Sequence, residues 1–79
     1  DTPKAIQRKK AGESIVAIIE FDVDEKGVTK NIYAHSSNNK NVERIALNAV
    51  QRYRYSPFIT NGTPQPMNNF QDTFMYTKQ

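Results

Sequence analysis

Residues 42–57 read VERIALNAVQRYRYSP, and this stretch carries the clearest structural signal in the chain. Apolar residues at i, i+3, i+4 and i+7 lie on one side of an α-helix, so the stretch predicts a helix with a single apolar stripe. Pro57 disfavours helical geometry at the residue before it, so we expect the helix to end near Tyr55. Asn39 and Asn41 are both suitable as the N-cap. The stripe consists of Val42, Ile45, Ala46, Ala49, Val50 and Tyr53.

The segment before this helix alternates with a period of two, which is typical of a strand with one buried face. Residues 24–27 follow it as a hairpin turn in which Gly27 supplies a positive φ. A returning strand is expected over residues 28–35, with Val28, Ile32 and Ala34 facing inward. The predicted buried face of the first strand contains Ile15, Ala17, Ile19, Phe21 and Val23.

The C-terminal part contains a turn and one more strand. Residues 61–64 read NGTP and predict the turn, and the prolines at 64 and 66 exclude a central strand there. The last strand is expected from Asn69 to Tyr76, with Phe70, Phe74 and Tyr76 on one face. Asp72 interrupts that face, which predicts a bulge or an exposed edge.

The N-terminal segment predicts a short basic helix. Thr2 would be its N-cap, Pro3 its first residue and Gly12 its end. The complete pattern is a single α+β domain over residues 1–79, in which residues 1–11 form a short basic helix or arm and residues 12–77 form the core. We expect a three-stranded antiparallel sheet with the long helix and the short N-terminal helix on one face.

The composition excludes several classes of function. A net charge of +3, from 11 Lys and Arg against 8 Asp and Glu, is too small to indicate nucleic-acid binding by itself. The chain has no cysteine, which excludes disulfides and thiolate chemistry. No apolar run approaches the roughly 20 residues that span a bilayer, and no signal peptide is present. The chain begins at Asp1 without methionine, so we expect it to be a fragment of a longer protein.

The chemistry of an enzyme is also missing from the sequence. His35 is the only histidine, no base stands beside Ser36 and Ser37, and there is no glycine-rich phosphate loop. Glu20, Asp22 and Asp24 share one strand face and could bind a hard cation, but a solvated face is the simpler interpretation. We therefore predict no catalytic residues, no metal and no cofactor.

Several segments together resemble the C-terminal domain of the TonB family. Residues 21–28, FDVDEKGV, followed by Asn31-Ile32, look like the family's hairpin, and Ser36-Ser37 looks like the end of its second strand. Residues 46–57, ALNAVQRYRYSP, are similar to the family pattern A-L-x-A-V-x-x-W-R-Y-x-P, and NGTP to its N-G-x-P turn. Tyr53 stands where the family usually has Trp, Ile15 where a glycine is expected, and the Tyr-Pro pair near the family's N-terminus is absent. The resemblance covers about residues 12–77.

The resemblance implies a periplasmic domain of an energy transducer that is anchored in the inner membrane and driven by an ExbB–ExbD motor. Such a domain would bind the TonB box of an outer-membrane transporter by strand addition, for uptake of iron complexes or similar nutrients. An unpaired sheet edge offers the backbone groups for this. The expected peptide-binding strand comprises Asn69, Phe70, Gln71, Asp72, Thr73, Phe74, Met75 and Tyr76.

Two further sets of residues are singled out by the sequence. The first is a basic cluster that could contact a transporter, made of Lys4, Gln7, Arg8 and Lys9, with Lys10 beside it. The second is expected to build the fold rather than to bind: Tyr53, Arg54, Tyr55 and Pro57. Two alternative functions stay open, a domain that self-associates, for example as a homodimer through its C-terminal strand, and a small RNA-binding module. We expect no nucleic acid among the partners.

Overall fold

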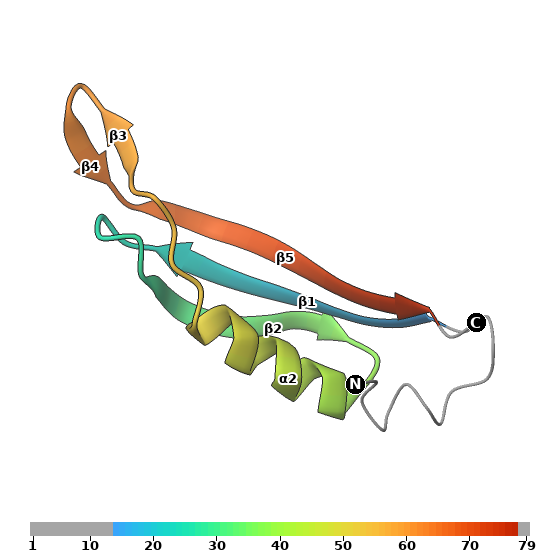
Figure 1. Cartoon of the computed structure of the whole chain (residues 1–79). Coiled ribbons are helices and arrows are strands. Elements are labelled where there is room, and N and C mark those ends of the chain that lie inside the picture. Colours follow the sequence, from blue (N-terminus) through green and yellow to red (C-terminus); the bar gives the residue numbers. More distant parts are fainter. Residues whose placement is uncertain (1–13, 78–79) are drawn as a thin grey trace.

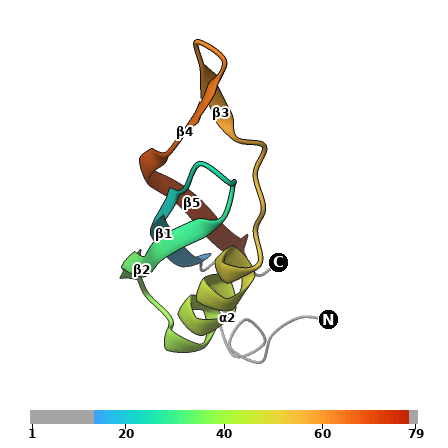
Figure 2. The same ribbon diagram turned by 90° about the vertical axis from the view of Figure 1, so that its left-hand side faces the viewer.

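A computed structural model describes residues 14–77 of the chain. Within this range the main sheet is antiparallel and has the strand order β2-β1-β5. Strand β1 (Ser14–Val23) is central, β2 (Thr29–Ser37) pairs with it on one edge, and β5 (Met67–Thr77) pairs on the other. Helix α2 (Lys40–Gln51) lies across one face of this sheet (Figures 1 and 2). The predicted α+β fold with a three-stranded antiparallel sheet and one long helix is confirmed.

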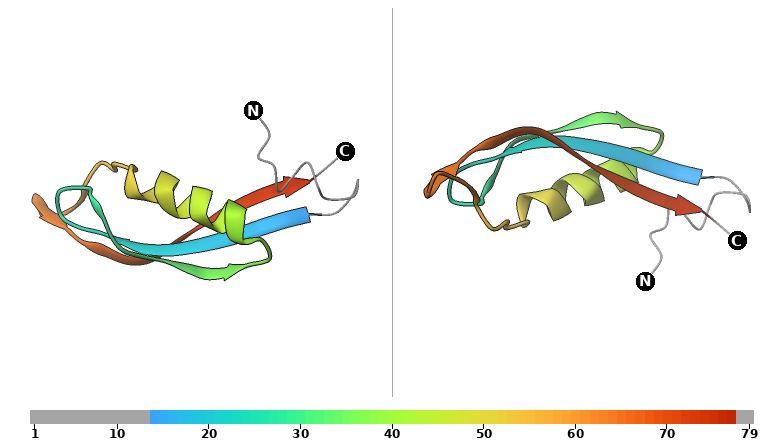
Figure 3. Two further views of the ribbon diagram at one scale, coloured as in Figure 1. Left: turned by 90° about the horizontal axis from the view of Figure 1, so that it is seen from below. Right: turned by 90° about the horizontal axis from the view of Figure 1, so that it is seen from above.

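The core forms where the alternating face of β1 meets the helix. All five predicted inward residues of β1 are buried, and they pack against Val42, Ala46 and Val50 of α2. Figure 3 shows the helix running along one side of the three strands. Ile45 was predicted to belong to the buried stripe, but its side chain is 39% exposed. The half-buried Leu47 packs against the core instead, so the buried face of the helix is turned away from Ile45.

The start of α2 follows from the sequence and its end does not. Asn39 is the N-cap, and its side chain accepts hydrogen bonds from the backbone N–H groups of Asn41 and Val42. The helix ends at Gln51, four residues before the predicted end at Tyr55. The reason is tertiary: the backbone N–H of Tyr55 donates to the carbonyl of Gly27, 2.9 Å away, so the chain leaves the helix to join the β1–β2 turn.

The turn between β1 and β2 is held by an aspartate and a glycine. Gly27 has a φ of +85°, as predicted, and its N–H donates to the Asp24 carbonyl. The Asp24 carboxylate accepts from the N–H groups of Lys26 and Val28, each at 2.9 Å. These bonds lower the pKa of Asp24, with the bond from Val28 as the main cause. The expected inward residues Ile32 and Ala34 are half-buried against the core.

A second hairpin was predicted only as a turn. Strands β3 (Phe58–Thr60) and β4 (Thr63–Gln65) pair with each other around Asn61 and Gly62. In Figure 1 this hairpin projects past one end of the main sheet, and β4 leads directly into β5. Pro64 is tolerated because β4 lies in a two-stranded ribbon, where only one edge of the strand needs its N–H groups.

Of the two alternatives predicted at Asp72, a bulge or an exposed edge, the structure has the edge, because β5 is an outer strand of the sheet. The bulge of β5 lies elsewhere. The register between β1 and β5 shifts between Phe21 and Val23, opposite Asn69, which has a φ of +62°. Asp72 stays in regular register with Ile19. The predicted short N-terminal helix lies outside the described residues. Within residues 14–77 no helix is long and apolar enough to cross a membrane.

Candidate functional site

The outer edge of β5, meaning the edge that faces away from β1, is the strand edge that the sequence analysis singled out. β5 pairs with β1 from Ser14–Thr77 to Phe21–Phe70 and again at Val23–Met67. Its outer edge has no partner strand among residues 14–77. All eight residues predicted to bind peptide, from Asn69 to Tyr76, lie on this strand. The outer edge therefore brings the predicted set together on one continuous backbone.

Hydrogen bonds at Val16 decide which β5 residues face outward. The Val16 carbonyl accepts from the Asn38 N–H at 3.0 Å, and the Val16 N–H donates to the Asn38 side chain at 2.9 Å. Asn38 directly follows β2, so the backbone polar groups of Val16 point toward β2 and away from β5. In an antiparallel pair, successive residues point their backbone groups to opposite edges, and two directly opposed residues do so alike.

The assignment for β5 follows from its register with β1. The register is regular from Ser14 to Phe21, and it pairs Val16 with Met75, Ile18 with Thr73 and Glu20 with Gln71. The N–H and C=O groups of these three β5 residues therefore point to the outer edge. The residues that alternate with them direct their backbone groups to β1 instead, and these are Phe70, Asp72, Phe74 and Tyr76.

Asp72 is an acidic residue on the apolar face of β5, and its partner lies on the segment that follows α2. The Tyr53 hydroxyl donates to the Asp72 carboxylate at 3.0 Å, on the helix side of the sheet. Burial, together with this bond, raises the pKa of Tyr53 to about 12. An acidic residue is thus accommodated on the apolar face of β5 without a bulge, because a half-buried phenol satisfies it.

An aromatic cluster joins the β1–β5 pair to the same segment. Tyr55 stacks on Phe70 with ring centroids 6.1 Å apart and an interplanar angle of 4°, and it also stacks on Phe21. Tyr53 packs edge-on against Phe21. The Arg54 guanidinium donates to the carbonyls of Tyr53 and Gln51, beyond the last helical turn. These contacts place Tyr53, Arg54 and Tyr55 at a junction of the fold.

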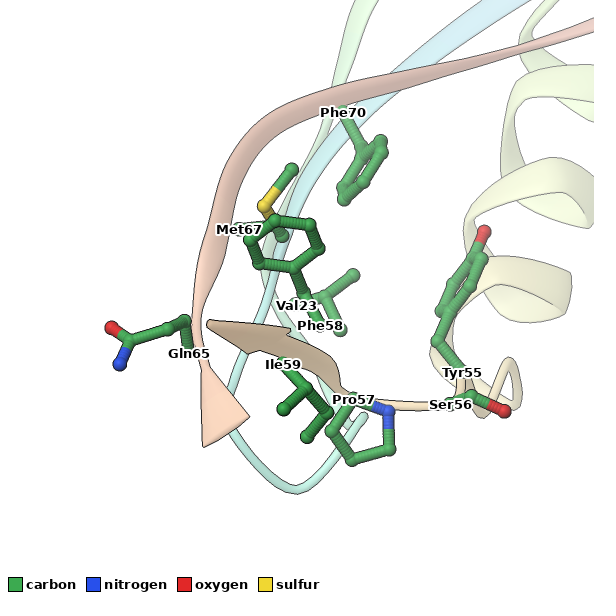
Figure 4. A pocket seen from close by; sticks show the side chains of 9 residues that line it. All are labelled: Val23, Tyr55, Ser56, Pro57, Phe58, Ile59, Gln65, Met67 and Phe70. Atoms are coloured by element: carbon green, nitrogen blue, oxygen red, sulfur yellow. The ribbon is translucent and has the colours of Figure 1, made fainter. Parts of the chain in front are cut away.

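A cavity of about 300 Å³ lies beside this cluster, at the start of β5. Figure 4 shows the side chains of Tyr55, Phe58 and Phe70 around it, from the connecting segment, β3 and β5. Sequence reasoning missed this feature, although the apolar pair Phe58-Ile59 between Pro57 and the NGTP turn was a signal for it. The full lining is Val23, Tyr55, Ser56, Pro57, Phe58, Ile59, Gln65, Met67 and Phe70.

The open face of the sheet carries the carboxylates that the sequence placed on one strand face. Glu20 accepts from the Tyr33 hydroxyl and from the Gln71 amide, and these bonds lower its pKa. Asp22 accepts from the Asn31 side chain and the Asn69 N–H, which lowers its pKa as well. Each carboxylate is thus occupied by protein donors, and within residues 14–77 no three metal-ligating side chains converge.

The basic cluster Lys4, Gln7, Arg8 and Lys9 lies outside the described residues. Its contact with a transporter stays a prediction.

The chain is similar to known proteins in both sequence and fold. The family described as Gram-negative bacterial TonB protein C-terminal matches residues 3–77. A comparison with curated proteins gives no match. Among solved structures, the TonB2 protein from Vibrio anguillarum aligns with a TM-score of 0.73 at 22% identity, covering 99% of this chain and 72% of that one. This likeness shows the shared fold, and the family match spans nearly the whole sequence. The chain therefore belongs to the family of C-terminal domains of Gram-negative bacterial TonB proteins.

Proposed function

We propose that this domain binds an extended peptide segment of an outer-membrane transporter, its TonB box, by strand addition to the outer edge of β5. Membership of the TonB C-terminal family makes it a periplasmic transduction and interaction domain. In the full-length protein it would sit at the end of a linker anchored in the inner membrane. There it would pass force from an ExbB–ExbD motor to the transporter for uptake of iron complexes or similar nutrients.

The observation that carries the proposal is the outward direction of the backbone groups of Gln71, Thr73 and Met75. Three residues present up to six hydrogen-bonding groups in one line, which an extended peptide can satisfy along its whole length. Each such bond contributes roughly 1 kcal/mol, and the loss of freedom on association offsets much of the sum. A micromolar or weaker affinity follows, which suits a partner that must be released after each cycle.

Self-association is the second candidate, because it would use the same edge. Two copies of β5 can pair in antiparallel fashion across a two-fold axis, which would satisfy the same outward groups. Peptide binding and dimer formation would then compete.

RNA binding is less well supported by the open face. Sheet-based RNA recognition needs exposed aromatics on which bases stack. Among residues 14–77 this face presents Tyr33, whose hydroxyl is bonded to Glu20, and the neighbouring Asp22 would repel phosphate.

A proline series along β5 tests the proposal, since proline removes one backbone N–H. Thr73→Pro deletes an N–H that points outward, so the domain should stay folded by circular dichroism. Its affinity for a synthetic TonB-box peptide should fall about fivefold or more, the equivalent of roughly 1 kcal/mol per lost bond. Asp72→Pro deletes an N–H that bonds to β1 and should destabilise the fold itself.

The series contains its own controls. Thr73→Ser keeps the backbone and should bind normally, and Met75→Pro should behave like Thr73→Pro. Gln71→Pro should also weaken peptide binding, but it should lower stability as well, because the Gln71 side chain donates to Glu20. Light scattering without peptide shows whether the same substitutions also weaken self-association. A folded Thr73→Pro variant with unchanged peptide affinity would rule out strand addition at this edge.

A further inference from the structure

The cavity at the start of β5 shares residues with the strand whose outer edge is the proposed binding site. Met67 and Phe70 line it and belong to β5, while Phe58 and Ile59 contribute from β3. Phe58 and Ile59 are 52% and 53% exposed, and Phe70 is 37% exposed. A group of apolar side chains is therefore open to solvent at one end of the edge that would hold the peptide.

Strand geometry determines which peptide side chain would meet this cavity. Directly paired residues in a sheet direct their side chains to the same face. Phe70 pairs with the buried Phe21 and stacks on Tyr55, so its side chain lies on the helix side of the sheet. A peptide residue opposite Phe70 would project its own side chain to that side, at the mouth of the cavity.

The spacing at this position favours close side-chain contact. Phe70 directs its backbone groups to β1, so it forms a non-hydrogen-bonded pair with a strand that adds in antiparallel fashion to the outer edge. Such pairs have the shorter Cα separation, about 4.5 Å, and bring the two side chains together.

The lining of the cavity specifies the chemistry of its occupant. Of its nine residues, all within the described part of the chain, none is charged, and the polar ones are Tyr55, Ser56 and Gln65. A volume of about 300 Å³ is at the low end for ligand pockets and leaves room for one large apolar side chain.

We infer that this cavity is a specificity subsite that takes one bulky apolar side chain, aliphatic or aromatic, of the extended partner peptide at the position opposite Phe70. The inference rests on the proposed strand addition and deepens it. The backbone of β5 would supply sequence-independent affinity, and the subsite would select peptides with an apolar residue at this one position. Substituting that residue by Ser should weaken binding about tenfold, the loss that corresponds to exposing one large apolar side chain.

The test uses two synthetic transporter peptides that differ only at the residue opposite Phe70, Leu in one and Ser in the other. Binding is followed by NMR on the isotope-labelled 79-residue chain, which gives affinities and reports separately on the amides of Thr73 and Met67. The Leu peptide should bind about tenfold more tightly than the Ser peptide, and it should shift the signals of Phe58 and Met67.

Phe58→Ser removes an exposed wall of the cavity without touching the core. This variant should bind the Ser peptide as the native chain does and should lose the preference for Leu. Ile45→Ser removes an exposed apolar side chain from α2, away from the cavity, and should preserve the preference. If neither peptide shifts the β5 amides, strand addition fails and the subsite with it. If both peptides shift Thr73 with equal affinity and Phe58→Ser changes neither, the subsite is refuted while strand addition stands.

Discussion

Gly27 is the residue at which backbone conformation and tertiary contact are most closely linked. Its positive φ was predicted from the turn, but the structure adds a second requirement. A Cβ placed on Gly27 would lie 1.9 Å from the carbonyl oxygen of Tyr55 and 3.0 Å from its carbonyl carbon. The same two residues share the hydrogen bond that draws the chain out of α2. Gly27 is thus needed for the packing of the aromatic segment as well as for the turn.

This double requirement predicts different costs for two glycine substitutions. Gly62 has a φ of +78° in the β3–β4 turn, and a Cβ there would meet nothing within 4 Å. Gly62→Ala should lower the free energy of unfolding by about 1–2 kcal/mol, the cost of the left-handed conformation alone. Gly27→Ala should lower the free energy of unfolding by about 2–3 kcal/mol more than Gly62→Ala does, because the backbone of Tyr55 must move as well. Denaturant titration measures both, and equal losses would show that the Tyr55 contact is unimportant.

At the scale of the elements, local patterns were good guides wherever one element buries one face. The alternation in β1 predicted every buried residue of that strand, because a period of two has a single solution in a half-buried sheet. The predicted end of α2 and the predicted burial of Ile45 were wrong. Both depend on how the helix and the segment after it pack against strands and a turn that are distant in sequence. The β3–β4 hairpin was predicted only as a turn, because strands of three residues leave little pattern to detect.

The N-cap of α2 predicts that alanine substitutions of two nearby asparagines, Asn39 and Asn41, have different effects on stability. Both were candidates from the sequence, and in the structure Asn39 holds the cap while Asn41 lies inside the first turn. Asn39→Ala should lower the free energy of unfolding by about 1 kcal/mol, because two N–H groups lose their acceptor. Asn41→Ala should be neutral or slightly stabilising, since Ala has the better helix propensity. Thermal unfolding of the two variants separates them, and a loss confined to Asn41→Ala would contradict the assignment.

For the molecule as a whole, the candidate site was predictable in place but not in detail. The resemblance to TonB domains and the position of the last strand pointed to the outer edge of β5, which has no partner strand within residues 14–77. The outward direction of Gln71, Thr73 and Met75 could not be predicted, because it follows from Val16 and Asn38, which lie in another part of the chain. The cavity was equally hidden, since it joins residues from β1, β3, β4, β5 and the segment after α2.

The carboxylates on the open face tie the sheet together across all three strands. Asp22 accepts from Asn31 on β2 and from the N–H of Asn69 on β5, and both asparagines have a positive φ where the register shifts. Glu20 likewise accepts from Tyr33 on β2 and Gln71 on β5. Strand β1 thus bonds to one bulge on each of its neighbours through the carboxylate of Asp22.

This arrangement predicts that the domain loses stability in acid. The pKa values of Glu20, Asp22 and Asp24 are all lowered, mainly by hydrogen bonds from Tyr33, Asn31 and the Val28 N–H respectively. A carboxylate with a lowered pKa stabilises the fold above its unfolded pKa, and the contribution disappears as the pH falls through the folded value. Their ordinary values are 4.5 for Glu and 3.8 for Asp, so the free energy of unfolding should decline below about pH 4.5.

Asp22→Asn is the variant that isolates the central carboxylate. It cannot titrate, so its free energy of unfolding should be lower than that of the native chain at pH 7, and the two should converge as the pH falls toward 3. Glu25→Gln, at an exposed position of the β1–β2 turn, changes the net charge by the same amount and serves as the control. Urea titrations at pH 7, 5, 4 and 3 measure the difference. If Asp22→Asn ran parallel to Glu25→Gln across this range, the charge of Asp22 would have no part in holding the two bulges, and the neutral amide would serve equally well.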